Sequence, residues 1–285
     1  MRDVSEILKE LELNLKLSSQ ELTNWNRSYL KNHEERYKHD FRILKEYYRS
    51  GEILEIGSIP CHFTYCLRKL GYPVIGVDLD PCRAREFIEK NALNVKRCDI
   101  EKEKIPFQDE NFGFVIFNEV FEHLRVDPIS ALQEINRVLK PNGIMLMTTP
   151  NLYYLPRIIR FNLGMGFNDA YKEFEKIHTL GHMGHIREYS TREVKTFLRK
   201  TEFEPIKIEY KSYRRGKEKK NMNPSPQQAA GYPVANGTSS FCGFHPAAKI
   251  KTYLLNILDS LCFFLPKLRS HQIFIAKKSI LSNEN

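Results

Sequence analysis

Apolar residues in the central part of the chain fall into short runs that alternate with segments of helical spacing. The run 53–56 (Ile-Leu-Glu-Ile) stops at Gly57, as a buried parallel strand does where the chain turns sharply. Residues 63–70 carry apolar side chains at helical spacing, and a second apolar run, 73–77, ends in Asp78. This order predicts a strand, a crossover helix and a parallel strand, which is the unit of a nucleotide-binding α/β sheet.

Polar residues stand at the ends of the predicted strands. Asp78 comes 23 positions after Glu55, where a carboxylate can accept hydrogen bonds from both hydroxyls of a ribose. The segment 98–100 (Cys-Asp-Ile) ends a third predicted strand, and 112–118 is a fourth, which ends in Asn118. The pattern therefore predicts a cofactor that contains a ribose, bound at the carboxyl edge of the sheet.

The turn after the first strand contains one glycine, Gly57. A dinucleotide-binding turn normally has three glycines, so that a pyrophosphate can approach the following helix closely. Here Ile59, Pro60 and Cys61 make the turn bulkier, and the proline has no amide donor. The turn argues against NAD or FAD and favours S-adenosylmethionine, which has no phosphate.

With these motifs the chain resembles the class I S-adenosylmethionine-dependent methyltransferases over roughly residues 53–203. The resemblance rests on Glu55-x-Gly57, Asp78, Asp99-Ile100, the segment 119–124 (Glu-Val-Phe-Glu-His-Leu) and the segment 137–143 (Arg-Val-Leu-Lys-Pro-Asn-Gly). It implies that Glu55 and Gly57 flank the methionyl part of the cofactor, that Asp78 holds the ribose, that Asp99 and Ile100 border the adenine, and that Asn118 lines the methionyl side. The family usually has further glycines where Ile59 and Cys61 stand in this chain.

The resemblance implies a Rossmann-like α/β fold: a mostly parallel seven-stranded sheet with helices on both faces and an antiparallel last strand, 271–277. The chain is expected to comprise an N-terminal helical lid (1–50), the cofactor-binding core (51–212), a basic and flexible insertion (213–248), and an amphipathic helix with the final strand (249–285). With 285 residues and 41% hydrophobic content, it is long enough for one sizeable core.

An aromatic stripe marks the predicted N-terminal helix, with a ring at every fourth position: Trp25, Tyr29, His33, Tyr37 and Phe41. Such a stripe suits a lid over the cofactor. It equally suits packing on the sheet, which is the commoner role of aromatic residues at this spacing.

Positive charge is concentrated near the C-terminus. From Lys207 onward there are 13 Lys and Arg against 4 Asp and Glu, so this part carries the whole net charge of +9. The basic segment 214–220 lies near the amphipathic segment 249–266, and such a combination can bind an anionic membrane surface. The alternative is a solvated loop beside a helix that covers the sheet.

The cysteines indicate a reduced, cytoplasmic protein. The six residues, at positions 61, 66, 82, 98, 242 and 262, form no C-x-x-C pair, and several fall in predicted buried elements. The first 17 residues are charged and amphipathic, unlike a secretory signal, and no apolar run reaches 18 residues. We therefore expect a cytoplasmic location, with peripheral membrane contact as the further hypothesis.

Candidate catalytic residues follow the fourth strand. If residues 119–124 begin a helical turn, Glu119, Glu122 and His123 share one face and can hold a cation such as Mg²⁺ or Mn²⁺. The set is similar to that of the metal-assisted O-methyltransferases of RNA 3′ ends and of ubiquinone synthesis, in which a distant histidine completes the site; His185 is the best match. Without a metal, His182 or His185 is a candidate general base, and Glu122 and His123 belong to the same catalytic neighbourhood.

These features lead to three functional hypotheses. The first is O-methylation of a hydroxyl on a sugar, glycan or lipid-linked precursor, because the segments 148–151 and 184–190 are similar to those of methyltransferases that modify surface polysaccharides. The second is metal-assisted ribose methylation of RNA, which clustered Lys and Arg would favour, although no RNA-binding module is recognisable. The third is a non-catalytic scaffold.

Overall fold

The computed structural model describes residues 2–166, 168–180, 184–213, 262 and 264–279 of the chain. Helices lie at Val4–Asn14 (α1), Gln20–Tyr47 (α2), His62–Lys69 (α3), Arg85–Lys90 (α4), Pro128–Val138 (α5), Leu155–Asn162 (α6), Ala170–Leu180 (α7) and Thr191–Lys200 (α8), with short 3₁₀ turns at Pro81–Ala84 (η1), Phe121–His123 (η2) and Pro266–Leu268 (η3). Strands lie at Glu52–Ile56 (β1), Val74–Asp78 (β2), Val95–Arg97 (β3), Phe112–Asn118 (β4), Leu139–Pro150 (β5), Phe203–Lys211 (β6) and His271–Lys278 (β7).

The described strands form one seven-stranded sheet in the order β3-β2-β1-β4-β5-β7-β6. Neighbouring strands from β3 to β5 pair in parallel, whereas β7 pairs antiparallel with both β5 and β6. The predicted fold class, including the antiparallel last strand, is confirmed. The strand order reverses between β1 and β4, and the carboxyl edge at such a switch point is where open α/β sheets bind ligands.

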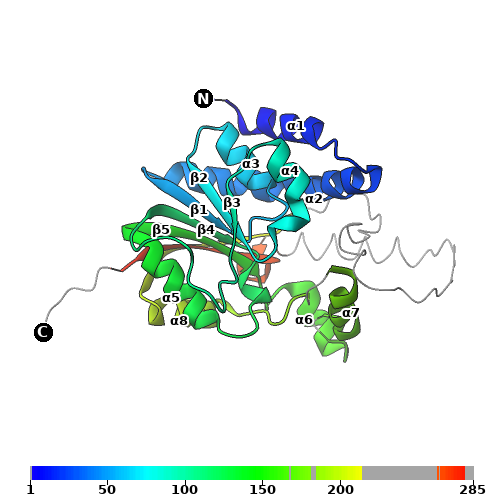
Figure 1. The fold of residues 1–285 in the computed structure, drawn as a ribbon. Helices are drawn as coiled ribbons and strands as arrows, with labels where there is room; N and C mark the ends of the chain where they lie inside the picture. Colours follow the sequence, from blue (N-terminus) through cyan, green and yellow to red (C-terminus); the bar gives the residue numbers. More distant parts are fainter. Residues whose placement is uncertain (1, 167, 181–183, 214–261, 263, 280–285) are drawn as a thin grey trace, which may run out of the picture.

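Two hydrophobic cores cover the two faces of the sheet, and Figure 1 shows α1 to α4 on one face and α5 with α8 on the other. Strand β4 divides its side chains between them, because successive residues of a strand point to opposite faces. Phe114 and Ile116 join the core under α1 to α4, whereas Val115 and Phe117 join the core under α5 and α8. Burial on both faces explains why β4 reads as a continuous apolar run.

Helix α2 is 28 residues long and begins at the N-cap Ser19, whose hydroxyl accepts a hydrogen bond from the Leu22 amide. Its aromatic stripe has two parts. Tyr37 and Phe41 are buried against Phe63 of α3, with ring centroids 5.3 and 4.4 Å from that ring. Nearer the helix start, Trp25 lines a pocket beside the turn after β1, together with Leu17, Leu22, Asn26, Ile59, Pro60, Arg83, Ala84, Glu86 and Phe87.

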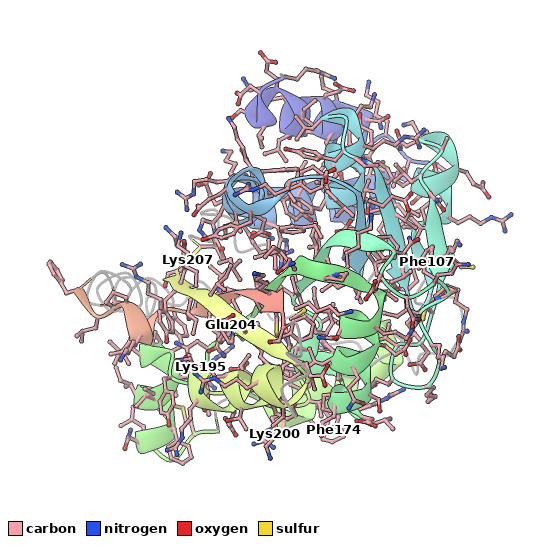
Figure 2. The ribbon with its side chains drawn as sticks, turned by 90° about the vertical axis from the view of Figure 1, so that its left-hand side faces the viewer. Phe107, Phe174, Lys195, Lys200, Glu204 and Lys207 are labelled. Atoms are coloured by element: carbon pink, nitrogen blue, oxygen red, sulfur yellow. The ribbon has the colours of Figure 1, made fainter. Side chains whose placement is uncertain are left out.

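Strand β6 forms one edge of the sheet, where Glu204 and Lys207 project (Figure 2). Charged side chains on an edge strand discourage pairing with another chain. Among the described helices, none has the length and apolar content needed to cross a membrane. The basic segment 214–220 and almost all of the segment 249–266, on which the membrane hypothesis was based, lie outside the described residues.

Gly57 and Gly71 provide a matched test of the turn after β1. Both have positive φ angles, +71° and +86°, so alanine at either position should cost about 1–2 kcal/mol of stability. A Cβ at Gly57 would lie 2.3 Å from Cγ2 of Val120, whereas one at Gly71 would meet nothing within 4 Å. We expect Gly57→Ala to lose a further ~1–3 kcal/mol through overpacking, measured by urea denaturation.

The double variant Gly57→Ala/Val120→Ala should recover part of this extra loss, because it removes the overlapping methyl group. Equal losses for Gly57→Ala and Gly71→Ala would show that the contact with Val120 does not constrain the turn.

Candidate functional site

The turn after β1 is tied to the end of β2 through Asp78. One carboxylate oxygen of Asp78 accepts a hydrogen bond from the Ile59 amide at 3.1 Å, and the other accepts one from the Asp80 amide at 3.0 Å. Cys61 closes the turn in the left-handed conformation, with φ of +67°. Asp78 is therefore held in a fixed orientation at the carboxyl edge of the sheet and remains partly exposed.

Glu55 faces the protein interior beneath this turn. Its carboxylate accepts a hydrogen bond from the Thr64 hydroxyl of α3 at 2.5 Å, and the residue is only 6% exposed. Burial raises the pKa of the Glu55 carboxyl to about 8, against the opposing effects of Thr64 and Arg36. Glu55 thus links β1 to α3 within the protein.

The predicted adenine-bordering residues follow β3, which ends at Arg97, slightly earlier than expected. The Asp99 carboxylate accepts a hydrogen bond from the Glu101 amide at 3.2 Å and pairs with Lys102 at 3.1 Å. Ile100 is buried, whereas Leu79, directly after Asp78, is 49% exposed. An exposed apolar side chain beside Asp78 is suited to contact with an aromatic base.

The end of β4 meets a pair of buried charges from α2 that the sequence analysis missed. The Asn118 amide nitrogen donates to Asp40 at 3.1 Å, and Arg36, one helical turn earlier, lies 3.9 Å from the Glu119 carboxylate. Arg36 and Asp40 are 7% and 1% exposed. The sequence did contain a signal for their burial, because Arg36 and Asp40 are spaced i, i+4 and stand directly before Tyr37 and Phe41 of the aromatic stripe. Charged residues on the inner side of a helix are rarely buried without a function or a partner.

Glu119 is not part of the compact group that contains Glu122 and His123, and the prediction that the three share one helical face is wrong. Glu119 has a φ of +56°, so the chain turns at this residue before the 3₁₀ turn η2 begins. Its carboxylate accepts a hydrogen bond from the Thr148 hydroxyl at 2.8 Å and lies 3.5 Å from His271 of β7. Despite its burial, His271 and Arg36 hold the pKa of the Glu119 carboxyl well below its usual range.

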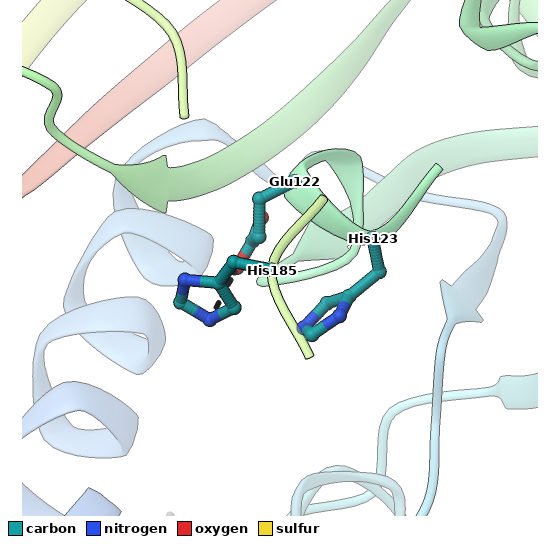
Figure 3. A group of neighbouring side chains, drawn as sticks. All are labelled: Glu122, His123 and His185. Carbon is teal, nitrogen blue, oxygen red and sulfur yellow. Dashed lines mark ion pairs between the residues drawn. The ribbon is translucent and has the colours of Figure 1, made fainter. Parts of the chain in front are cut away.

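Glu122, His123 and His185 form a compact group after β4 (Figure 3). One ligand atom of each lies within 4.8 Å of the others, and Nε2 of His185 is 4.0 Å from Oε1 of Glu122. The second Glu122 oxygen accepts a hydrogen bond from the Thr149 hydroxyl at 3.0 Å. Three of the four predicted metal ligands are therefore brought together, and His182 lies outside the described residues.

Glu188, which the sequence analysis did not single out, holds His185 in place. Its carboxylate lies 3.1 Å from Nδ1 of His185 and pairs with Arg157 of α6. The backbone carbonyl of Glu122 accepts hydrogen bonds from the amides of Ile186 and Arg187, at 2.8 and 3.3 Å. The segment carrying His185 is thus fastened directly to the turn that carries Glu122.

Burial sets the protonation of this group. It lowers the pKa of the His185 imidazole to about 4, with His123 acting in the same direction, so the ring is neutral at pH 7. Burial, together with Glu119, raises the pKa of the Glu122 carboxyl well above its usual range. Oε1 of Glu122 has no hydrogen-bond partner among the described residues. A neutral imidazole beside such a carboxyl can accept a proton, and the same atoms can ligate a metal.

The comparison with known families decides the identity of the fold. A family model described as a methyltransferase domain matches residues 29–208, which is more than half of the chain. The chain belongs to the class I S-adenosylmethionine-dependent methyltransferases. The matched region begins inside α2 and ends in β6, so it contains Arg36, Asp40, the turn after β1 and the group around Glu122.

Individual relatives match a shorter segment of this methyltransferase. It is 37% identical over 97 residues to the uncharacterized methyltransferase YodH of Bacillus subtilis, covering 33% of this chain and 41% of the relative. It is 30% identical over 102 residues to a ubiquinone biosynthesis O-methyltransferase of Cereibacter sphaeroides, covering 35% and 41%. The matched segment thus spans about two fifths of the length of either relative.

Solved structures show the same fold at low sequence identity. A S-adenosylmethionine-dependent methyltransferase from Archaeoglobus fulgidus aligns with a TM-score of 0.53 and 18% identity, covering 86% of this chain and 94% of that one. A possible histamine N-methyltransferase from Thermotoga maritima aligns with a TM-score of 0.53 and 20% identity, covering 90% and 96%. The first name indicates no acceptor and the second indicates histamine, and at this low identity the shared fold does not select an acceptor for this chain.

The raised pKa of Glu55 predicts a specific pH dependence of stability. Between its ordinary value of 4.5 and about 8, the folded state holds a proton that the unfolded state has lost, so stability falls as pH rises through this window. Glu55→Gln cannot lose that proton and keeps an acceptor for Thr64. The stability of wild type relative to Glu55→Gln should fall by up to ~1.4 kcal/mol per pH unit.

Urea denaturation of both proteins at several pH values from 4.5 to 8 measures this difference, and effects of all other titrating groups cancel in it. A difference that is independent of pH would contradict the assignment of a buried, protonated Glu55.

Proposed function

We propose that this methyltransferase transfers a methyl group to a hydroxyl on a sugar, glycan or lipid-linked precursor. The observation that carries the proposal is the neutral His185, oriented through Nδ1 by Glu188 and presenting Nε2 toward Glu122. A hydroxyl must lose its proton as it is methylated, and a fixed neutral imidazole can accept that proton. The relatives from Cereibacter sphaeroides, named as O-methyltransferases, support an oxygen acceptor.

The residues at the carboxyl edge fit the cofactor. Asp78 keeps lone pairs for ribose hydroxyls, although its oxygens already accept two backbone hydrogen bonds. Leu79 and Ile100 supply apolar contacts for the adenine, and Asp99 lies beside them at the end of β3. Asn118 is assigned to the methionyl side. When bound, S-adenosylmethionine supplies an electrophilic methyl group.

His185 is the proposed general base. It takes the hydroxyl proton at Nε2, while Glu188 accepts a hydrogen bond from Nδ1 and stabilises the charge that develops on the ring. Glu122 lies beside the same nitrogen and fixes the 184–188 segment through its backbone carbonyl. His123 packs edge-on against His185, with ring centroids 4.9 Å apart, and limits the positions the ring can adopt.

An apolar surface beside this group supports a lipid-linked acceptor. The large side chains Tyr153, Phe161, Leu163, Met165, Tyr171 and Phe174 of α6, α7 and their neighbouring segments are each at least 44% exposed. The surface is joined to the catalytic segment, because Glu173 of α7 accepts a hydrogen bond from the His185 amide at 2.9 Å. Large exposed apolar side chains that gather on neighbouring segments are candidates for binding a lipid or a partner.

Two variants separate cofactor binding from chemistry. Asp78→Asn should weaken the binding of S-adenosylhomocysteine, measured calorimetrically, by about tenfold, which corresponds to ~1.4 kcal/mol of charge-assisted hydrogen bonding. His185→Gln should leave this affinity unchanged and reduce methyl transfer by about 10²–10⁴-fold. Transfer is measured with radiolabelled cofactor on matched hydroxylated acceptors with and without an isoprenoid or acyl chain.

Failure of wild type to bind S-adenosylhomocysteine would contradict the assigned cofactor site. Full activity of His185→Gln would remove the proposed base, and a preference for acceptors without the lipid chain would argue against the lipid-linked class.

A metal-assisted reaction is the second candidate, favoured by the spacing of the ligand atoms of Glu122, His123 and His185. A bound Mg²⁺ or Mn²⁺ would act as a Lewis acid that lowers the pKa of an acceptor hydroxyl. Mixed carboxylate and imidazole donors suit Mn²⁺ better than Mg²⁺. Both mechanisms use the same side chains and differ in their need for the ion.

Glu122→Gln and Glu119→Gln distinguish the two arrangements of ligands. If the group binds metal as the structure arranges it, calorimetric titration with Mn²⁺ should show binding that Glu122→Gln abolishes and Glu119→Gln retains. Loss in both variants would restore Glu119 as a ligand. An absence of Mn²⁺ binding in wild type, with methyl transfer unaffected by EDTA, would exclude the metal-assisted candidate.

A further inference from the structure

An arginine and an aspartate of α2 are buried where the helix passes the carboxyl edge of the sheet, and burial raises the pKa of the Asp40 carboxyl to about 7. Arg36 and Asp40 lie one turn apart and are less than one tenth exposed. Both reach the end of β4, where Asp40 accepts a hydrogen bond from Asn118 and Arg36 approaches Glu119. Burying charges is costly unless each has a partner of good geometry, so this pair requires an explanation.

The partners within the protein are incomplete. Among the described side chains, three neighbouring buried atoms have no hydrogen-bond partner: Nε of Arg36, Oδ1 of Asp40 and Oδ1 of Asn118. Native proteins leave few buried polar atoms unpaired, because each one is destabilising. The unpaired set consists of one cationic donor and two acceptors, one of which belongs to a carboxylate.

The nearest hydrogen-bonding groups at the end of β4 are already engaged. The remaining oxygen of Asp40 already accepts from Asn118 at 3.1 Å. Glu119 is shared between Thr148 at 2.8 Å and His271 at 3.5 Å, and it lies 3.9 Å from Arg36. Glu119 therefore offsets part of the Arg36 charge without reaching its Nε. A ligand that carries a carboxylate and a cationic hydrogen-bond donor together would satisfy all three atoms.

We propose that Arg36, Asp40 and Asn118 bind the zwitterionic amino-acid end of the cofactor, with Arg36 donating to its carboxylate and the two Oδ1 atoms accepting from its ammonium group. This inference rests on the proposed cofactor site and adds to it the residues of α2. It assigns a ligand-binding role to a helix whose sequence indicated only a lid or a packing element.

The topology places this cluster and Asp78 on opposite sides of the turn after β1. Strand β1 pairs with β2 on one side, where Ile56 is opposite Val77, and with β4 on the other, where Ile56 is opposite Phe117. The following residues are Gly57, Asp78 and Asn118 on the three strands in turn. A cofactor bound across Gly57 thus has its ribose at β2 and its amino-acid end at β4.

Truncated ligands test the proposal on the full-length protein. S-adenosylhomocysteine carries the amino-acid end, whereas 5′-methylthioadenosine keeps the adenosine and the sulfur without it. Arg36→Gln and Asp40→Asn should each weaken S-adenosylhomocysteine binding about 10- to 100-fold, as expected for lost hydrogen bonds to charged groups. Their affinity for 5′-methylthioadenosine should change less than about twofold. Asp78→Asn should weaken both ligands, and Arg42→Gln, exposed on the same helix, should change neither.

A test on wild type alone avoids any effect of substitution on folding. Decarboxylated S-adenosylhomocysteine lacks the partner proposed for Arg36, so wild type should bind it at least about tenfold more weakly than the parent ligand. Equal affinities, or an equal effect of Arg36→Gln and Asp40→Asn on both ligands, would overturn the inference while leaving the cofactor proposal in place. Failure of wild type to bind either adenosine ligand would overturn both.

Discussion

The close contact between Val120 and the turn after β1 is the constraint on which the rest of the site depends. Val120 lies over Gly57 at a separation that leaves no room for a side chain. This contact brings the segment after β4 against the edge where β1 and β2 end. Asp78 at the end of β2 and Asn118 at the end of β4 therefore lie on the two sides of the same turn.

A second constraint is the backbone conformation of Glu119, the residue before Val120. Because Glu119 adopts a positive φ, Glu119 and Glu122 have different hydrogen-bond partners, although Glu119 still acts with burial to raise the pKa of Glu122. Glu119 joins the buried charges of α2 and β7, whereas Glu122 joins His123 and His185. The segment 119–122 therefore contains two glutamates whose pKa values shift in opposite directions. Despite burial, the pKa of Glu119 is lowered by His271 and Arg36, and the pKa of Glu122 is raised by burial.

Much of the fold was predictable because each buried strand leaves a local signal. The apolar runs of β1, β2 and β4 and the polar residues at their ends identify the sheet and its cofactor edge. The site was less predictable where it depends on contacts between distant segments. Arg36 and Asp40 gain their role from the path of α2 across the sheet, and Glu188 gains its role from a loop that folds back onto Glu122. The divergence of Glu119 depends on one backbone angle, which helical spacing cannot reveal.

The proposed cofactor-binding groups and the proposed base come from different parts of the chain. Helix α2 and the end of β2 hold the groups proposed for the cofactor, which are Arg36, Asp40 and Asp78. The chain between β5 and α8 carries His185, and it is held by Arg157 and Glu173 from α6 and α7. These two helices also bear the exposed apolar side chains, so the acceptor surface and the proposed base belong to one segment. If this segment binds the acceptor as proposed, a change of acceptor would fall on α6 and α7, while the groups proposed to hold the cofactor could stay as they are.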